Sequence, residues 1–528
     1  MNKKLKRLTA ISAAAVMSLS CLAGCGMYKS PSRDAIKVML SGTEPVGWEA
    51  VLEKYNEVGP GVELNVEWVS PGDMKDKLNL RMTAGEDYDL VFDAPFLKLK
   101  NFASDGIYEA LEPYILESDD YPSLKAAYDE EVWKANYYYG HLYAIPNMRT
   151  YGNGIDCVYY RKDLAEKYGI GEIDSYEKYQ AFLDAILANE PSMIPLGVSA
   201  SRGFYTLFAQ DGVEYAKDHI VRISAGGFCH ILLNDEETEV IDIVYEGSSP
   251  EEYAAFPEKY RDGQKFGQAR LNKLVEWNKY LETDSLNQKD AGAIFKGGKA
   301  ASIIDNLDAY EQMASDLKNA MPDSELGTFI ISDTVRNMEN EARVTSLQGN
   351  NFLAIPATSK KIDKTLTFLN WLFESKENHD LFELGIEGKD WTAIGDDQYS
   401  LPSQDGKMAS SLQYTFPGYV MTWNPHYVRF SDRLPDNILE YKKYDLKPEA
   451  YYPSPLAGFM FDTSSIQTEM TKVNAIMAEN ATALEHGALA NPVEVLQKEN
   501  AEAEKSGREE IKAELRKQVN EFLANKNK

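Results

Sequence analysis

The sequence predicts an α/β fold, in which short strands alternate with helices along the chain. Residues 36–40, apolar except for Lys37, have the length of a strand, and residues 62–68 alternate apolar and polar side chains as a half-buried strand does. Helical patterns follow each of them, at 48–56 and 74–83, and residues 88–92, apolar except for Asp89, are predicted to form a buried strand. This βαβα order predicts a doubly wound α/β layer.

The same alternation continues through the rest of the chain. We expect further strands at 142–146, 157–160, 300–304 and 352–355. We expect helices at 162–169, 175–189 and 364–373, an amphipathic segment at 271–281, a long helix over 465–483 and a charged helical tail over 493–525. No apolar run in the mature chain approaches the ~18 residues that cross a bilayer, so we expect no transmembrane helix there.

Length and charge limit the class of protein. The chain has 528 residues, enough for two or three domains of ~150 residues each. It carries 83 acidic and 55 basic residues, a formal net charge of −28. A protein that grips the phosphates of a nucleic acid needs a basic face, and an anionic membrane surface attracts basic segments. The composition therefore argues against nucleic acid as a partner and against electrostatic docking on a membrane.

The first 33 residues have the features of an export and anchoring segment. Basic residues at 3, 4, 6 and 7 precede an apolar stretch that is too short to span a bilayer comfortably. Residues 22–25, Leu-Ala-Gly-Cys, resemble a bacterial lipobox, in which the cysteine is diacylated. We therefore expect a signal peptide over 1–24, a lipidated Cys25 and a tether over 25–33. A generic export signal with a chance cysteine is the alternative interpretation.

Motifs for catalysis, metals and nucleotides are incomplete or missing in the sequence. The segment 292–299 ends in Gly-Gly-Lys, but Ala300 stands where a phosphate loop needs Ser or Thr. We interpret it instead as a helix end, a glycine turn and a strand start. The six histidines are scattered, and neither a G-x-S-x-G nor an EF-hand-like pattern occurs. We expect no metal and no cofactor, and we favour reduced, buried Cys157 and Cys229 over a disulfide.

Aromatic, amide and carboxylate side chains gather at predicted strand ends. In an open α/β sheet, ligands bind beyond the carboxyl ends of the strands. Trp and Tyr rings stack on the C–H faces of sugars, while Asp and Asn hydrogen-bond hydroxyl groups. Core packing is the alternative for each aromatic residue, and a cap or turn for each Asn or Asp. The predicted ligand-binding residues are Trp48, Asp93, Asn147, Tyr151, Asp305, Asn306, Asn350, Asn351, Trp391 and Trp423.

Several segments carry a family resemblance. Besides the lipobox, they are 142–146, 158–164, 295–301, 385–391 and 459–462. In this order and spacing they resemble the extracellular solute-binding lipoproteins of carbohydrate ABC importers in Gram-positive bacteria. The resemblance implies a two-lobed, periplasmic-binding-protein-like (type II) α/β fold with hinge strands and an interlobe cleft. It implies an N-terminal lobe of 34–146 plus 300–346 and a C-terminal lobe of 147–299 plus 347–528.

The same resemblance implies a function. A monomeric, lipid-anchored protein on the extracellular face of the membrane would capture an oligosaccharide and deliver it to an ABC permease and ATPase, without making or breaking a covalent bond. Trp48 and Trp391 would be the sugar platforms. Two alternatives stay open: a membrane-tethered exported glycoside hydrolase, whose paired carboxylates could be any of the many acids, and a binding protein for a non-sugar solute such as a peptide.

Overall fold

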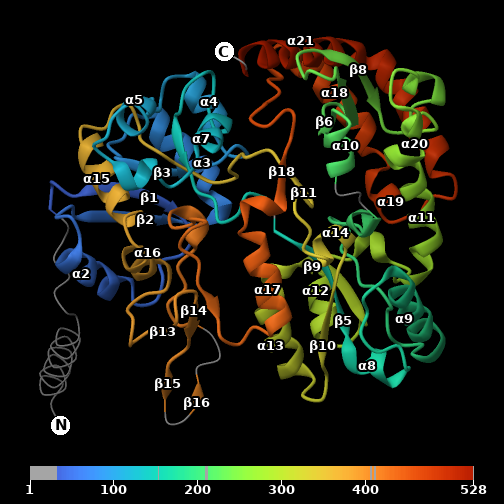
Figure 1. Ribbon diagram of the computed structural model, residues 1–528, viewed down its shortest axis with the longest axis horizontal. Helices are drawn as coiled ribbons and strands as arrows, with labels where there is room; N and C mark the ends of the chain where they lie inside the picture. The colour runs from blue at the N-terminus through green and yellow to red at the C-terminus, as the bar shows by residue number, and fades with distance from the viewer. Residues whose placement is uncertain (1–31, 153, 209–211, 405–406, 409–411, 527–528) are drawn as a thin grey trace, which may run out of the picture.

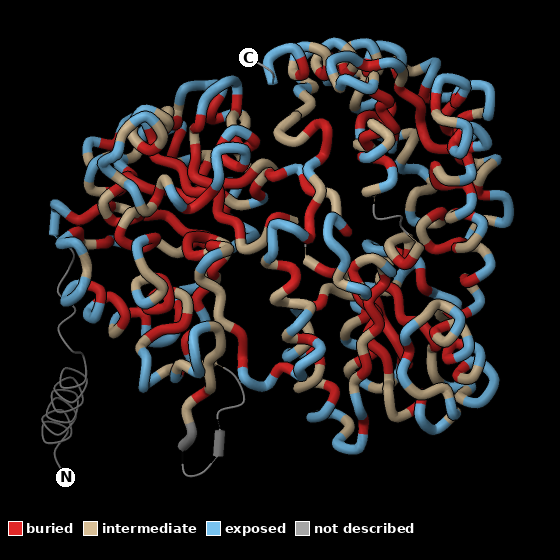
Figure 2. Tube along the Cα trace, in the orientation of Figure 1, coloured by how far each residue is buried: buried red, intermediate tan, exposed pale blue. Residues whose placement is uncertain are grey.

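The computed structural model describes residues 32–152, 154–208, 212–404, 407–408 and 412–526. The predicted signal peptide, Cys25 and most of the predicted tether lie outside these residues. The chain forms two lobes side by side, and the lobe on the right is itself built of a lower and an upper part (Figure 1). In Figure 2 the buried segments gather inside each of these three regions. Within the described residues no helix is long and apolar enough to span a bilayer.

The first lobe is built on a five-stranded sheet of order β2-β1-β3-β12-β4. Strand β1 pairs in parallel with β2 and β3, as the predicted βαβα pattern requires, whereas β12 is antiparallel to both of its neighbours. The strands are β1 (Ile36–Ser41), β2 (Leu64–Val69), β3 (Leu90–Asp93), β4 (Ala144–Pro146) and β12 (Phe352–Ala354). The main helices of this lobe are α2 (Trp48–Val58), α3 (Pro71–Thr83), α15 (Ile362–Leu372) and α16 (Lys376–Glu383).

The lower part of the second lobe has a three-stranded sheet of order β10-β5-β9, in which both outer strands run antiparallel to β5. Its strands are β5 (Asp156–Arg161), β9 (Ser302–Asn306) and β10 (Leu326–Ile330). Its helices are α8 (Lys162–Lys167), α9 (Tyr176–Asn189), α11 (Ala269–Trp277), α12 (Ala291–Lys296) and α13 (Tyr310–Ala320). The predicted glycine turn is confirmed: α12 ends at Lys296, and Gly298 has a φ of 72° before β9 begins.

The upper part of the second lobe combines a middle segment of the chain with its C-terminal segment. Its antiparallel sheet contains β6 (Ile220–Ser224), β7 (Phe228–Leu233) and β8 (Val240–Tyr245). The helices packed around it are α18 (Gln467–Ala478), α20 (Pro492–Ala503) and α21 (Glu509–Lys526), whereas the short helix α19 (Ala481–Glu485) contacts α18 and α11. The predicted helix over 465–483 is therefore two helices, and the predicted tail is interrupted at Gly507, which has a φ of 112°.

The predicted division of the chain between the two lobes is wrong in two places. We assigned 300–346 to the N-terminal lobe, but β9 and β10 pair with β5 in the second lobe. We assigned residues from 347 onward to the C-terminal lobe, but β12 lies between β3 and β4 in the first lobe, and α16 packs near α2. The physical reason is strand order: pairing partners far apart in sequence are not encoded in the local pattern of each strand.

Three connections join the lobes. The first is 147–155, the second is 331–351, and the third is 432–450, which contains helix α17 (Asp436–Asp445). Two short strands, β11 (Arg343–Thr345) and β18 (Tyr451–Pro453), pair in parallel where the second connection passes the end of the third. Arg343 fixes this junction by bonding the Asp445 carboxylate and the Gly154 carbonyl. Tyr451 donates to Asp445 as well, at 2.8 Å.

The remaining elements are short. The first lobe also contains a sheet of β13 (Thr392–Ile394), β14 (Gln398–Ser400) and β17 (Phe430–Ser431), next to the pair β15 (Ser403–Gln404) and β16 (Lys407–Met408). The further helices are α4 (Leu99–Ser104), α5 (Glu112–Ile115), α6 (Pro122–Lys125), α7 (Glu130–Ala135), α10 (Val213–Lys217) and α14 (Asp333–Arg336). Cys157 and Cys229 are both buried and free, as predicted.

Candidate functional site: a cavity between the lobes

A cavity of about 270 Å³ lies between the lobes. One wall belongs to the first lobe and consists of α16 with residues from the segment 412–434. The opposite side carries Asp308 and Glu311, which lie just after β9 and at the start of α13 in the second lobe. Arg149 in the first connection and Lys442 in the third complete it. The cavity is therefore bounded by both lobes and by two of the segments that join them.

The wall segment 417–423 is anchored at two points. Thr422 donates a hydrogen bond to the Glu383 carboxylate at the end of α16. Asn147, in the first connection, donates through Nδ2 to the carbonyl oxygens of Gly418 at 3.1 Å and Tyr419 at 2.5 Å. A Cβ atom at position 418 would lie 2.3 Å from Glu383 Oε2, so a larger residue there would have to displace the carboxylate that holds Thr422. The wall is thus fixed both to α16 and to the connection between the lobes.

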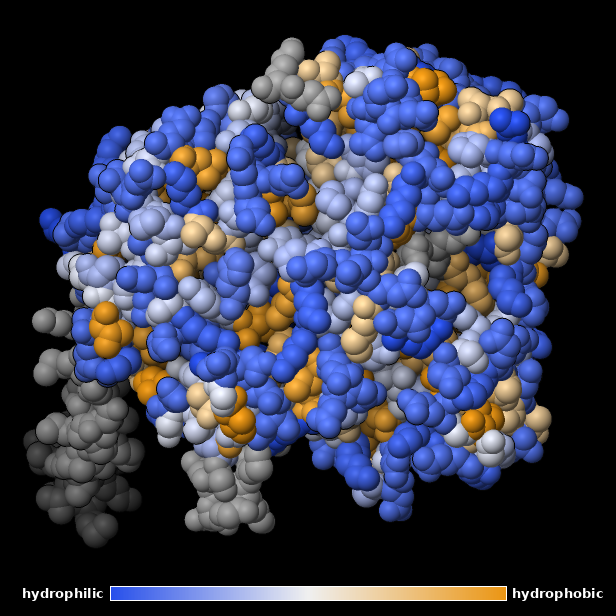
Figure 3. Space-filling model, in the orientation of Figure 1, coloured by the Kyte–Doolittle hydropathy of each residue, from blue (hydrophilic) through white to orange (hydrophobic). Residues whose placement is uncertain are grey.

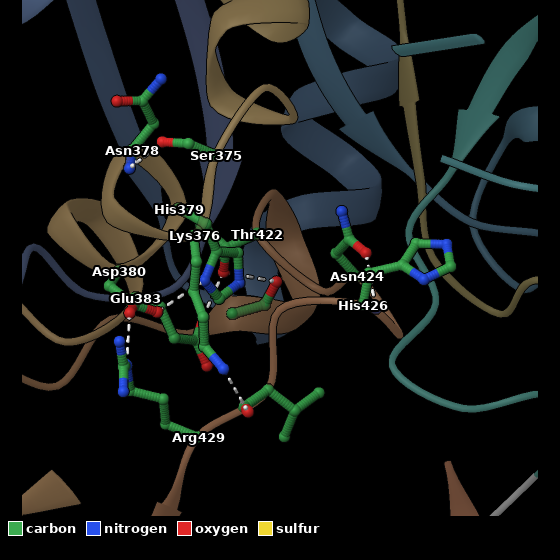
Figure 4. A network of polar contacts seen from close by, with 12 residues as sticks. Ser375, Lys376, Asn378, His379, Asp380, Glu383, Thr422, Asn424, His426 and Arg429 are labelled. Carbon is green, nitrogen blue, oxygen red and sulfur yellow. Dashed lines mark hydrogen bonds and ion pairs between the residues drawn. The ribbon is translucent and has the colours of Figure 1, made fainter. Parts of the chain in front are cut away.

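A polar network, largely buried, lies within this wall (Figure 4). Asp380 accepts hydrogen bonds from Arg429 Nε at 2.5 Å and from His379 Nδ1 at 2.9 Å. Arg429 uses Nη1 to bond the carbonyl oxygens of Gly395 and Asp396, each at 3.2 Å. Lys376 donates to the Val428 carbonyl at 3.3 Å, and burial followed by the charge of Arg429 lowers the pKa of Lys376.

Aromatic rings on the same wall reach the cavity. Trp423, Tyr427 and Tyr399 line it and are half-buried, so part of each ring contacts solvent. Trp423 packs edge-on against Tyr419, with ring centroids 6.2 Å apart. Burial raises the pKa of Tyr399, so its phenol stays protonated near neutral pH. The cavity therefore offers flat apolar surfaces together with hydroxyl, imidazole, carboxylate and guanidinium groups.

A second cavity of about 270 Å³ lies in the second lobe, at the carboxyl end of β9. Its lining includes Arg202, which bridges Asp305 at 2.9 Å and Asp156 at 3.3 Å. The N-terminus of α12 also borders it, where the Asp290 side chain accepts a hydrogen bond from the Ala293 N–H. The ion pairs of Arg202 thus occupy the carboxylates at this end of the second cavity.

The structure separates the ten predicted site residues. Trp423 lines the interlobe cavity and Asp305 lines the second cavity. Asn147 supports the wall segment from below, and Asn351 accepts a hydrogen bond from the Asn147 N–H at 2.9 Å. Asn350 is exposed, and Tyr151 is buried with its ring 6.0 Å from that of Tyr451.

Four of the predicted residues have structural partners. Trp48 is 3% exposed and packs against the rings of Trp68, Phe382 and Phe416 at 5.6–5.8 Å. Trp391 is 3% exposed and donates to the Gly385 carbonyl at 3.1 Å. Neither ring lines the interlobe cavity, so the structure places both tryptophans, predicted as sugar platforms, away from this cavity. Asp93 is buried and accepts a hydrogen bond from Tyr108 at 2.6 Å, and Asn306 caps the turn before α13.

The residues of α16 and Arg429, which directly precedes β17 (Phe430–Ser431), were not predicted from the sequence. His379, Asp380, Glu383 and Tyr399 do not follow any strand that we predicted, because they belong to a helix and a small sheet inserted after β12. The one available signal was the aromatic density of the segment 414–427, where Tyr, Phe and Trp recur every few residues.

Comparison with known proteins identifies the family. Residues 41–379, more than half of the chain, match the model of bacterial extracellular solute-binding proteins, and residues 455–524 match a domain of unknown function (DUF3502). A carbohydrate ABC transporter substrate-binding protein of Streptococcus pneumoniae serotype 4 is 23% identical over 99% of this chain and 100% of the relative.

Solved structures share the fold. The N-glycan transport solute-binding protein NgtS of Streptococcus pneumoniae matches with a TM-score of 0.69 at 20% identity, over 94% of this chain and 100% of that one. The same protein in complex with Man1GlcNAc matches with a TM-score of 0.59 at 19% identity, over 93% and 100%. A solute-binding protein described as binding HMO, from Bifidobacterium longum infantis, matches with 0.56 at 15%, over 93% and 100%. The two-lobed α/β fold predicted from the sequence is therefore confirmed, and the chain belongs to the family of bacterial extracellular solute-binding proteins.

Proposed function

We propose that this protein captures an uncharged oligosaccharide in the interlobe cavity and delivers it to an ABC importer. One observation carries the proposal: the cavity is bounded by both lobes and combines half-buried aromatic rings with hydrogen-bonding groups. Stacking on Trp423 and Tyr427 would supply affinity, and the polar side chains would select the pattern of hydroxyl groups. The relatives support the proposal, since their names describe carbohydrate, N-glycan and HMO binding.

Closure of the lobes would follow from the same geometry. A sugar that contacts the first-lobe wall and the Asp308–Glu311 side at once makes more contacts when the lobes approach. It therefore favours the closed state by the difference in its affinity for the two states. Binding alone leaves the ligand intact, so we propose a carrier and not an enzyme, with the importer's permease and ATPase as partners of the closed form.

Isothermal titration calorimetry with a panel of neutral oligosaccharides tests the proposal. Man1GlcNAc and Man5GlcNAc belong in the panel because NgtS has been solved with each of them. We expect micromolar or tighter binding of at least one member, and no release of reducing sugar. Failure of every sugar, together with binding of peptides, would refute the proposal in favour of a non-sugar solute. Release of reducing sugar would refute it in favour of a glycoside hydrolase.

Anchoring at the outer face of the membrane is the second part of the proposal. It rests on the lipobox at residues 22–25. Mass spectrometry of the protein purified from its native host should find Cys25 as the N-terminal residue with its thiol acylated. A Cys25→Ala variant should leave the membrane fraction. An unmodified thiol at Cys25 would contradict the anchor but not the binding function.

A further inference from the structure

We infer that His379 is a specificity-determining residue of the interlobe cavity, and that its Nε2 atom accepts a hydrogen bond from a hydroxyl group of the ligand. The inference rests on the proposed function and deepens it, because it names the chemical group that this position recognises. It follows from three features of the described residues: the tautomer of the ring, the rigidity of its carboxylate partner and the open second nitrogen.

The tautomer follows from the hydrogen bond between His379 and Asp380. Nδ1 lies 2.9 Å from Asp380 Oδ1. A carboxylate paired with a guanidinium, as Asp380 is with Arg429, only accepts hydrogen bonds, so Nδ1 must carry the proton. In the neutral imidazole the other nitrogen, Nε2, then has a free lone pair and acts as an acceptor. Whenever the imidazole is neutral, the pair thus presents an acceptor at its far end.

The carboxylate is held rigidly. The side chain of Asp380 is 2% exposed, and its Oδ2 bonds Arg429 Nε at 2.5 Å. The Arg429 guanidinium is itself fixed by backbone carbonyls of residues 395–398 and lies over the Trp391 ring, 5.1 Å from its centroid. Asp380 is therefore a positioning residue: it fixes the tautomer and orientation of the imidazole.

The second nitrogen is open. Nε2 accepts no hydrogen bond from any described residue, although the His379 side chain is only 5% exposed and its ring lines the cavity. The Tyr427 ring, which also lines the cavity, has its centroid 5.8 Å from that of the imidazole. A sugar ring that stacks on Tyr427 is therefore within reach of Nε2 through its hydroxyl edge. A bound ligand that lacks a donor at that point would shield this acceptor from water and leave it unpaired.

Three variants test the inference, with Man5GlcNAc as the titrant. His379→Phe keeps the shape of the ring but removes the acceptor, and we expect binding weaker by about tenfold to a hundredfold. His379→Gln retains an acceptor near the position of Nε2, and we expect most of the affinity to return. Asp380→Asn can donate to Nδ1 and release the wrong tautomer, so we expect a loss like that of His379→Phe.

A matched control and a spectroscopic readout separate recognition from packing. His426 is exposed in the segment 412–434, and His426→Phe should bind as the unmodified protein does. In protein labelled with ¹⁵N-histidine, the Nε2 resonance of His379 should shift on addition of Man5GlcNAc, which a purely structural histidine would not do. Unchanged affinity in a folded His379→Phe variant, or an unmoved Nε2 resonance at saturation, would overturn the inference. Absence of binding by the unmodified protein to every sugar of the panel would refute the proposed function itself, and the inference with it.

Discussion

Trp48 and Trp423 should respond in opposite ways to truncation, and this contrast tests how the structure divides the aromatic residues. Trp48 is 3% exposed and touches three other rings. A buried tryptophan covers about 150–250 Å² of surface, which at ~25 cal/mol per Å² corresponds to about 4–6 kcal/mol. Neighbouring side chains partly fill the space left by the missing ring and lower this value, so we expect Trp48→Ala to destabilise the first lobe by about 3–5 kcal/mol.

Differential scanning calorimetry measures this loss. Each kcal/mol shifts the melting temperature of a 150–250-residue unit by about 2–4 °C, so the transition of the first lobe should fall by roughly 6–20 °C. Titration calorimetry well below the transition should then find sugar affinity little changed. Trp423→Ala should do the reverse, with a small thermal shift and binding weaker by about 1–3 kcal/mol. Lost binding with an unshifted transition in Trp48→Ala would refute the assignment of Trp48 to the core.

Three further predictions concern stability and reactivity. Burial raises the pKa of Asp93 to about 6, above its unfolded value of about 4, so the contribution of Asp93 to stability falls as the pH rises from 4 to 6. Asp93→Asn should therefore reduce the fall in unfolding free energy between pH 4 and 6 by roughly 1–3 kcal/mol. An unchanged pH dependence in this variant would contradict the prediction. Burial raises the pKa of the Cys229 thiol to about 12 and raises that of Cys157 further, so neither thiol should react with a disulfide reagent in the native protein, whereas both should react in urea. Arg508 is fully buried and donates hydrogen bonds to Asn500 at 2.6 Å and to the Gly226 carbonyl at 2.8 Å. Arg508→Ala should therefore destabilise the upper part of the second lobe by about 2–4 kcal/mol. Limited proteolysis should show faster cleavage of that part alone.

Local patterns predicted the elements better than their partners. The strands β1 and β3 and the helix α2 were predicted to within about two residues at each end, because strand length and helical periodicity are written in adjacent residues. The β6–β7 hairpin was not predicted, although the pair Gly226-Gly227 is a turn signal in the sequence. In the structure these two glycines form the turn, with φ values of 71° and 113°. The insertion of β12 between β3 and β4 has no local signal at all.

The site illustrates the same limit. The rings of Trp48 and Trp423 are chemically alike, and no sequence pattern tells which one is covered. Trp48 is covered by Phe382 of α16 and by Phe416, both far away in the sequence, so its burial depends on long-range contacts. The pair of His379 and Asp380 is adjacent in sequence, but only the cavity shows that the ring is a candidate ligand contact.

The three connections between the lobes also limit how the molecule can move. A single connection would let one lobe rotate freely relative to the other. Three connections, with β11 in the second paired to β18 at the end of the third, resist twisting of one lobe against the other. We therefore expect the relative motion of the lobes to be a hinge bending at these connections. Because Asn147 in the first connection is hydrogen-bonded to the carbonyls of Gly418 and Tyr419, such bending would move the aromatic wall together with that connection.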